Sequence, residues 1–320
     1  MSEGEERPGS RRRTLLLAGA GGAAGLCAVA GGAAAAALGG LLPGGVALRR
    51  VLGMTGPDGT VPATPAGAVG VDRVRSRARG REVDLAVMLP PGGTGGKTGG
   101  VPAPRSPLPV CLMLHGRGSD ARGMVALGTP HFLAAAVRSG VPPFAIVAVD
   151  GGEATYWHRR TPGDDPQAML RDELPGWLRS RGLATATGGL PATVLGISMG
   201  GSGALQYALG RADRPPDAVA LLSPALFRTW ADARTAGGYD DQADWRAHEP
   251  LLRLEGSRPP RVAATLGVWC GAEDPFCPAA RELAAATRAD EAQFPAGAHT
   301  EGFWRRVMPD ALALVGAPRR

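Results

Sequence analysis

The chain has 320 residues, and 44% of them are hydrophobic, so it can bury a sizeable core in one large domain or two small ones. Its 35 basic and 29 acidic residues give a formal net charge of +6, and a single basic residue, Lys97, is a lysine. The arginines are scattered and no basic run alternates with aromatic residues, so the composition argues against nucleic-acid binding.

The N-terminal segment differs in composition from the rest of the chain. Arg11 and Arg12 precede an apolar run, and no charged residue occurs at positions 14–48. This pattern resembles a twin-arginine export signal, and the alanines at 33–37 suit a signal peptidase. The uncharged run is also long enough for an uncleaved membrane anchor. We therefore expect residues 1–48 to be an export signal or a membrane anchor, and the protein to be secreted or held in the cell envelope.

A linker and one large domain are expected after this segment. Residues 49–80 are predicted to be a linker, because Gly, Pro and Thr are frequent in their first part. The domain is expected over 81–320 and begins with an alternating segment, 81–90, that is typical of an edge strand. Residues 92–109 are rich in Gly and Pro and are predicted to be a flexible insertion.

The insertion contains a short sequence that resembles a phosphate-binding loop. The sequence GGKT ends at Thr98, but Pro91 occupies the position of the first required glycine and no helix-forming sequence follows. Such a loop needs a helix start behind it to direct backbone N–H groups at phosphate. We therefore expect no nucleotide to bind there.

From residue 108 onward, strand-like apolar segments alternate with helical ones. The predicted strands are 108–116, 143–152, 192–198, 218–226, 262–271 and 291–297, and the predicted helices include 165–182, 278–288 and 302–315. This alternation predicts an α/β fold with a mostly parallel central sheet and helices on both faces. Within the first helix, Pro175 is expected to cause a kink or break. Residues 227–258 do not fit the alternation and are predicted to be a cap-like excursion over the carboxyl edge of the sheet, where ligands bind in such folds.

A serine lies between glycines where a predicted strand meets a predicted helix. Gly196, Ser198 and Gly200 form the pattern G-x-S-x-G, and apolar residues recur at helical spacing after it. In this context the pattern indicates a nucleophile elbow, a strained turn that exposes the hydroxyl at the edge of the sheet. The glycines are needed because side chains there would collide with the neighbouring strand and helix. Ser198 is therefore the candidate nucleophile.

A serine hydroxyl needs a base that accepts its proton. His299 lies between the last predicted strand and the last predicted helix, where a loop can bring it over Ser198, so it is the candidate base. His131 falls in a predicted helix and His248 in the excursion. His158 lies on the loop after the second buried strand and is expected to line the site.

The remaining candidates for binding and stabilisation come from the neighbouring loops. Trp157 and His115 are expected, with His158, to contact the substrate. The backbone N–H groups of Met199 and Arg117 are expected to form an oxyanion hole, since both follow strand ends at the same edge. The Arg117 side chain could alternatively bind an acidic substrate.

An acid that orients the histidine is expected on the loop after residues 262–271. Asp274 is favoured because the following Pro275 restricts it to an extended conformation, and Glu273 is the alternative. Cys270 and Cys277 flank this loop and form either a disulfide or a pair of free thiols. A third cysteine, Cys111, falls in an apolar strand and is expected to be a buried thiol.

Five segments together resemble the esterase D/antigen 85 group of α/β-hydrolases, over about residues 108–315. They are HGRG at 115–118, ELPGWLRSRG at 173–182, GISMGGSGAL at 196–205, AEDPF at 272–276 and AHTEGFW at 298–304. The family includes carboxylesterases, hydrolases of S-formylglutathione, and exported acyltransferases that load mycolic acids onto trehalose.

The resemblance implies Ser198 as nucleophile, His299 as base, an acid at or near Asp274, and Met199 and Arg117 as oxyanion donors. It implies no metal and no organic cofactor. The transferases of the family carry a glutamate as the acid, so the choice of acid stays open, and they carry Asp at the position of His115, which argues against transfer.

Three functions follow as hypotheses. The first is an exported serine carboxylesterase that acts on a small-molecule or lipid ester through an acyl-enzyme. The second is an acyltransferase that passes the acyl group to a sugar or lipid hydroxyl. The third is a secreted, non-catalytic binding protein on the same fold.

Overall fold

The computed structural model describes residues 1, 53, 55–98, 100–160, 162–183, 189–211, 213–256 and 260–317. The chain divides into two compact units, Met1–Gly56 and Pro57–Arg320, and the helices and strands given below belong to the second. The predicted export signal or anchor, apart from Met1, lies outside the described residues. Within the described part of the chain, each helix is too short or too polar to span a bilayer.

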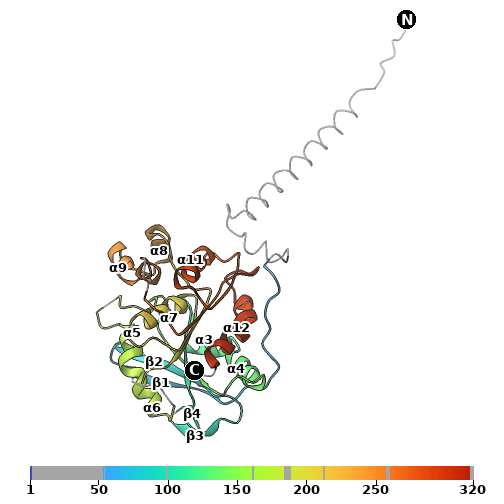
Figure 1. Cartoon of the computed structure of the whole chain (residues 1–320), viewed down its shortest axis with the longest axis vertical. Helices are drawn as coiled ribbons and strands as arrows, with labels where there is room; N and C mark the ends of the chain where they lie inside the picture. The colour runs from blue at the N-terminus through green and yellow to red at the C-terminus, as the bar shows by residue number, and fades with distance from the viewer. Residues whose placement is uncertain are drawn as a thin grey trace. The chain divides into compact units, whose positions relative to one another are not determined.

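The second unit is built on an eight-stranded sheet in the order β1-β2-β6-β5-β7-β8-β9-β10 (Figure 1). The strand β2 pairs antiparallel with β1 and β6, and the remaining neighbours pair in parallel. The strands are β1 Val69–Ser76, β2 Arg81–Met88, β5 Val110–Leu114, β6 Ala145–Val149, β7 Thr193–Ile197, β8 Ala218–Leu222, β9 Thr265–Trp269 and β10 Glu291–Gln293. The predicted mostly parallel α/β sheet is confirmed.

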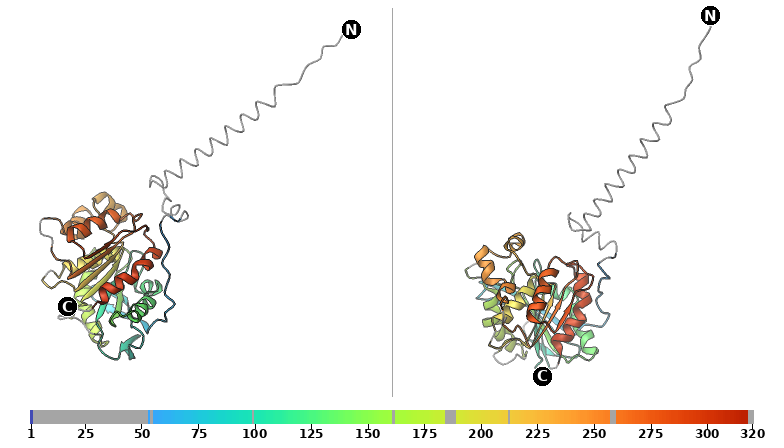
Figure 2. Two further views of the ribbon diagram at one scale, coloured as in Figure 1. Left: turned by 45° about the vertical axis from the view of Figure 1, so that its right-hand side comes forward. Right: turned by 45° about the horizontal axis from the view of Figure 1, so that its top comes forward.

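Helices cover both faces of this sheet, which explains why the central strands are buried at every position and almost entirely apolar. All residues of β5, β6, β7 and β8 are buried. One core contains α3 Ala121–Ala126, α4 Thr129–Arg138 and α12 Glu301–Gly316, which lie together in Figure 2. The opposite core contains the π-helix η1 Met169–Glu173, α6 Leu174–Arg179, α7 Met199–Leu209 and α11 Cys277–Thr287. The one-turn helix α5 Pro166–Ala168 precedes η1 and contacts α7.

The start of the domain differs from the sequence-based prediction. Residues 69–76, within the predicted linker 49–80, form the edge strand β1, so β2 is an internal strand and not the edge. The alternation in β1 is hard to recognise because the polar Ser76 is buried while the apolar Val69 at the start of the strand is exposed.

The predicted flexible insertion, 92–109, contains two strands that the sequence-based prediction missed. It forms an antiparallel hairpin of β3 Thr94–Thr98 and β4 Val101–Pro104. Val101 is fully buried and joins the main core. Burial of this one side chain gives the glycine-rich hairpin a fixed position against β1, which its composition does not reveal.

The predicted helix 165–182 is interrupted by one wide turn. The π-helix η1 lies between α5 and α6. Pro175 is in the first turn of α6, a position that tolerates proline because an N–H there makes no hydrogen bond within that helix.

The predicted excursion consists of three short helices after β8. These are α8 Trp230–Ala236, α9 Gln242–His248 and α10 Pro250–Arg253. Each begins after a side chain that accepts a hydrogen bond from an N–H of the first turn, namely Thr229, Asp241 and Glu249. The helices α8 and α9 lie side by side (Figure 1).

Candidate active site

Ser198 joins β7 to α7 in a strained turn. Its backbone has φ 54° and ψ −119°, and residues other than glycine rarely adopt a positive φ. Three backbone hydrogen bonds hold it: its N–H donates to Leu222, and its carbonyl accepts from the N–H groups of Gly201 and Ala225. The surrounding structure therefore over-determines the strained geometry, as is common at functional sites.

The glycines beside Ser198 have a steric cause. A Cβ at Gly200 would lie closer than 3.0 Å to the carbonyl of Leu114 in β5, and one at Gly196 would meet the carbonyl of Gly200 equally closely. Gly201 is limited in the same way by Pro224. Glycine therefore lets α7 start immediately after β7.

Ser198, His299 and Asp274 form one hydrogen-bonded chain. The distance between His299 Nε2 and Ser198 Oγ is 2.8 Å, and that between His299 Nδ1 and Asp274 Oδ2 is also 2.8 Å. Asp274 is 3% exposed and Ser198 7%, whereas the His299 side chain is 26% exposed. Phe276 and Trp304 contact the imidazole by their edges, with ring centroids at 5.2 and 5.1 Å. These two aromatic rings limit the orientations that His299 can take.

The two candidate acids have different partners. Asp274 bonds to His299 through Oδ2, and its Oδ1 accepts the N–H of Phe276 at 2.9 Å. Glu273 instead accepts the N–H of Gly297 at 2.6 Å. Glu273 thus holds the loop that carries His299, while Asp274 contacts the imidazole itself.

The HGRG turn lies directly against Ser198. A Cβ at Gly116 would be 3.3 Å from the Cβ of Ser198. Arg117 is the next residue and lines the same cavity as Ser198, and Met199 is the first residue of α7, where an N–H has no partner within the helix. The Arg117 side chain points to α8 and donates to the carbonyl of Ala236 at 2.7 Å.

A cavity of about 800 Å³ opens at Ser198 and His299. Its apolar lining includes Met124, Leu127, Tyr156, Phe276 and Trp304, and its polar lining includes Arg117, Ser119 and Glu301.

The three predicted substrate-binding side chains do not line this cavity. His115 and Trp157 are fully buried. His115 Nε2 accepts the N–H of Gly151 at 2.9 Å, and Trp157 donates from Nε1 to the His115 carbonyl at 3.2 Å. Trp157 also packs on α7, where a Cβ at Gly203 would collide with it. His115 and Trp157 therefore anchor the HGRG turn from within the core. This corrects the prediction that they contact substrate.

His158 also lies away from the cavity, because the chain reverses locally before it. Tyr156 and Trp157 both have positive φ, 48° and 60°, which turns Trp157 into the core while Tyr156 lines the cavity. His158 is 1% exposed and contacts Asp244 and His248 instead. The prediction for His158 is therefore corrected as well.

Sequence reasoning missed the aromatic lining of the cavity. Tyr156 precedes Trp157, Phe276 lies two residues after Asp274, and Trp304 lies in the first turn of α12. Phe276 and Trp304 lie close in sequence to Asp274 and His299, and this nearness was the available signal for them. Tyr156 adjoins the predicted binding residue Trp157.

The three cysteines in the described part of the chain are free thiols. Cys111, Cys270 and Cys277 are all buried and unpaired with one another. Burial raises the pKa of Cys111 to about 12 and also raises that of Cys270, so both stay protonated at neutral pH. No disulfide braces the Asp274 loop in this structure.

Comparison with protein families identifies the family to which the chain belongs. Residues 76–314, most of the chain, match the family described as "Putative esterase". The chain belongs to that esterase family. This membership makes it an enzyme that acts on ester bonds, and the predicted resemblance is confirmed.

Solved esterase structures share the fold. A ferulic acid esterase has a TM-score of 0.63 at 19% identity, covering 79% of this chain and 99% of that one. An S-formylglutathione hydrolase from Agrobacterium tumefaciens has a TM-score of 0.58 at 19% identity, covering 81% and 98%. The MPT51 protein of Mycobacterium tuberculosis has a TM-score of 0.55 at 18% identity, covering 79% and 100%. No curated protein sequence matches the chain.

Proposed function

We propose that the protein is an exported serine carboxylesterase that hydrolyses its substrate through a covalent acyl-enzyme. The observation that carries this proposal is the chain of two 2.8 Å hydrogen bonds from Ser198 through His299 to Asp274. A nucleophile, a base and an orienting acid at these distances are the groups that ester cleavage requires.

In the first step, Ser198 Oγ attacks the ester carbonyl while His299 Nε2 takes its proton. Asp274 accepts the Nδ1–H of His299, which fixes the tautomer whose Nε2 lone pair faces the hydroxyl. The same carboxylate stabilises the imidazolium that forms. Burial of Asp274 strengthens this interaction because little water competes for it.

The negative charge that develops on the carbonyl oxygen needs donors placed in advance. The N–H groups of Met199 and Arg117 are proposed to supply them, since both residues adjoin Ser198. The start of α7 adds a favourable field, because helix N-termini carry partial positive charge.

Collapse of the tetrahedral intermediate breaks the ester C–O bond. His299 gives its proton to the departing alcohol, and the acyl group remains on Ser198. A water molecule then attacks the acyl-enzyme, His299 takes its proton, and the carboxylic acid leaves as Ser198 recovers its hydrogen. The cycle needs no metal or organic cofactor.

The lining of the cavity favours an ester with an apolar or aromatic acyl group. Tyr156, Phe276 and Trp304 provide flat apolar surfaces, and a volume of about 800 Å³ suits a small-molecule or short lipid ester. We propose that the acyl group binds among these rings.

A second cavity supports acyl transfer as the alternative function. It has a volume of about 450 Å³, is lined by Arg81, Asp120, Asp150 and Glu153, and shares Gly118 with the first. A polar pocket that shares lining residues with the Ser198 cavity suits a polyhydroxylated alcohol, either as leaving group or as acceptor. A non-catalytic binding protein is disfavoured because every triad member has its partner.

Hydrolysis and transfer are distinguished by one product analysis. The purified protein is given a series of nitrophenyl esters of increasing acyl length, methyl ferulate and S-formylglutathione, each with and without glycerol or trehalose. Hydrolysis predicts free acid at the same rate in both conditions. Glyceryl or trehalosyl esters as the main products would instead support transfer.

The export proposal rests on the sequence of residues 1–48 alone. Replacing Arg11 and Arg12 together by Lys is expected to keep the protein in the cytoplasm, as measured by cell fractionation. Equal export of both forms would contradict a twin-arginine route.

A further inference from the structure

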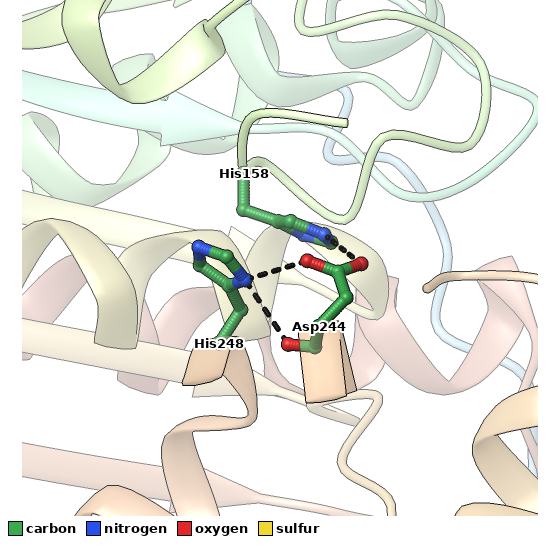
Figure 3. Close-up of side chains that lie close together, drawn as sticks. All are labelled: His158, Asp244 and His248. Carbon is green, nitrogen blue, oxygen red and sulfur yellow. Dashed lines mark hydrogen bonds and ion pairs between the residues drawn. The ribbon is translucent and has the colours of Figure 1, made fainter. Parts of the chain in front are cut away.

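Three side chains of metal-binding types, two imidazoles and one carboxylate, meet outside the Ser198 cavity (Figure 3). Asp244 and His248 lie one turn apart on α9, and His158 reaches them from the loop that follows β6. His158 Nε2 is 3.2 Å from Asp244 Oδ2, and His248 Nδ1 is 2.8 Å from Asp244 Oδ1. The three donor groups therefore converge from two segments that are distant in the sequence.

The spacing of these donors is close to that of a zinc site. Zinc binds imidazole nitrogen and carboxylate oxygen at about 2.0–2.2 Å, so that ligand atoms in a tetrahedral site are about 3.4 Å apart. His158 Nε2 lies 3.2 Å from Asp244 Oδ2, and His248 Nδ1 lies 2.8 Å from the other carboxylate oxygen, Oδ1; with one ligand atom taken from each residue, all three lie within 4.8 Å of one another. His248 Nδ1 is also 3.0 Å from the backbone carbonyl oxygen of Asp244, so the His248 side chain, which is 37% exposed, must turn away from that carbonyl to bind an ion.

The buried member of the group is held in position. The ring of His158 stacks on Tyr239 at 5.1 Å and on His248 at 4.5 Å. Its Nδ1 has no hydrogen-bond partner among the described residues, so the ring is held by stacking and not, as is usual for a histidine that binds metal, by an acceptor at Nδ1.

We propose that His158, Asp244 and His248 bind a divalent transition-metal ion, with Zn²⁺ as the best fit. Imidazole and carboxylate donors suit Zn²⁺ better than Mg²⁺ or Ca²⁺, which prefer all-oxygen sites. The fourth position faces solvent beside His248 and takes water. The ion joins α9 to the loop that carries Tyr156, so it stiffens one wall of the Ser198 cavity without entering it.

The test measures metal uptake by the full chain after treatment with EDTA. Equilibrium dialysis against Zn²⁺, followed by metal analysis, is expected to give one tightly held equivalent per chain. Co²⁺ in place of Zn²⁺ is expected to produce visible absorption bands typical of four nitrogen and oxygen ligands. Zn²⁺ is also expected to raise the midpoint of thermal unfolding.

Matched variants locate the site. His248→Gln changes a half-exposed residue at the end of α9, and Asp244→Asn keeps the size of the side chain; both are expected to lose the Zn²⁺ equivalent and the thermal shift. His131→Gln, a histidine outside the group, is expected to keep them. Absence of a bound equivalent in the unmodified chain, or equal uptake by the chain and both variants, would overturn the proposal. The three side chains would then be a hydrogen-bonded group that holds no metal.

Discussion

His299 Nε2 lies 2.8 Å from Ser198 Oγ, although 101 positions separate the two residues in the chain. Ser198 is placed by the strained junction of β7 and α7, and His299 by the loop between β10 and α12. The capping of α12 by Thr300, which accepts the N–H of Phe303, fixes where that loop ends. The site therefore depends on the parallel sheet to bring its separate loops to one edge.

Asp274→Asn is expected to lower kcat/KM by about 10⁴-fold without unfolding the protein, because an amide can hold His299 in the wrong tautomer. The measurement is steady-state hydrolysis of a nitrophenyl ester. Glu273→Gln is the matched control, since its amide oxygen can still accept from Gly297, and it is expected to retain most of the activity. Similar losses in both variants would count against Asp274 as the orienting acid.

Arg117→Ala tests whether the side chain or the backbone of this residue acts in the reaction. The backbone N–H remains, so kcat with a neutral ester is expected to fall by less than about tenfold, compared with about 10²–10³ for loss of an oxyanion donor. Paired assays with a neutral ester and one carrying a carboxylate on its acyl group provide the measurement. A large loss confined to the charged ester would instead assign substrate recognition to the guanidinium.

Gly200→Ala is expected to destabilise the fold by about 3 kcal/mol or more, because the new methyl group would collide with the Leu114 carbonyl. Gly176→Ala is the matched control: a Cβ there meets no atom within 4 Å, and alanine favours the helix by up to about 1 kcal/mol. Denaturant unfolding compares the two variants. Equal stability of both would contradict the steric account of the elbow.

Glu249 makes the stability of the protein depend on pH. Burial raises its pKa from 4.5 to about 8, and its carboxyl group bonds to the hydroxyl of Tyr239 at 2.9 Å. Between these two pH values the unfolded chain releases the proton that the folded chain keeps, so stability falls as pH rises, by roughly 1.4 kcal/mol per unit.

Glu249→Gln removes this titration while keeping an acceptor for Tyr239. The free energy of unfolding of the variant, relative to the unmodified chain, is therefore expected to rise steadily from about pH 5 to about pH 8. Denaturant unfolding at several pH values measures the difference. A difference that stays constant across this range would show that Glu249 is ionised in the folded protein.

Sequence reasoning succeeded where function depends on the end of a strand. The glycines around Ser198, and the positions of Asp274 and His299 after successive strands, follow from the parallel topology, because carboxyl ends of parallel strands share one edge. The alternation of apolar and helical segments was sufficient to predict that topology.

The direction of individual side chains could not be predicted in the same way. His115 and Trp157 lie in the expected loops, but positive φ at residues 156 and 157 turns the indole into the core and leaves Tyr156 at the cavity. Local sequence carries no signal for such a reversal, since neither residue is glycine. The strand β1 was missed for a different reason: its buried positions include the polar Ser76 and its exposed positions the apolar Val69, so the apolar alternation is broken.

The central claim is that an acyl group is carried on the Ser198 hydroxyl. A fluorophosphonate probe followed by peptide mass spectrometry tests it most directly, with Ser198→Ala as the control. The account predicts one adduct on Ser198, no adduct in the variant, and hydrolysis at background level in the variant. An adduct on another residue, or unchanged ester hydrolysis by Ser198→Ala, would contradict it.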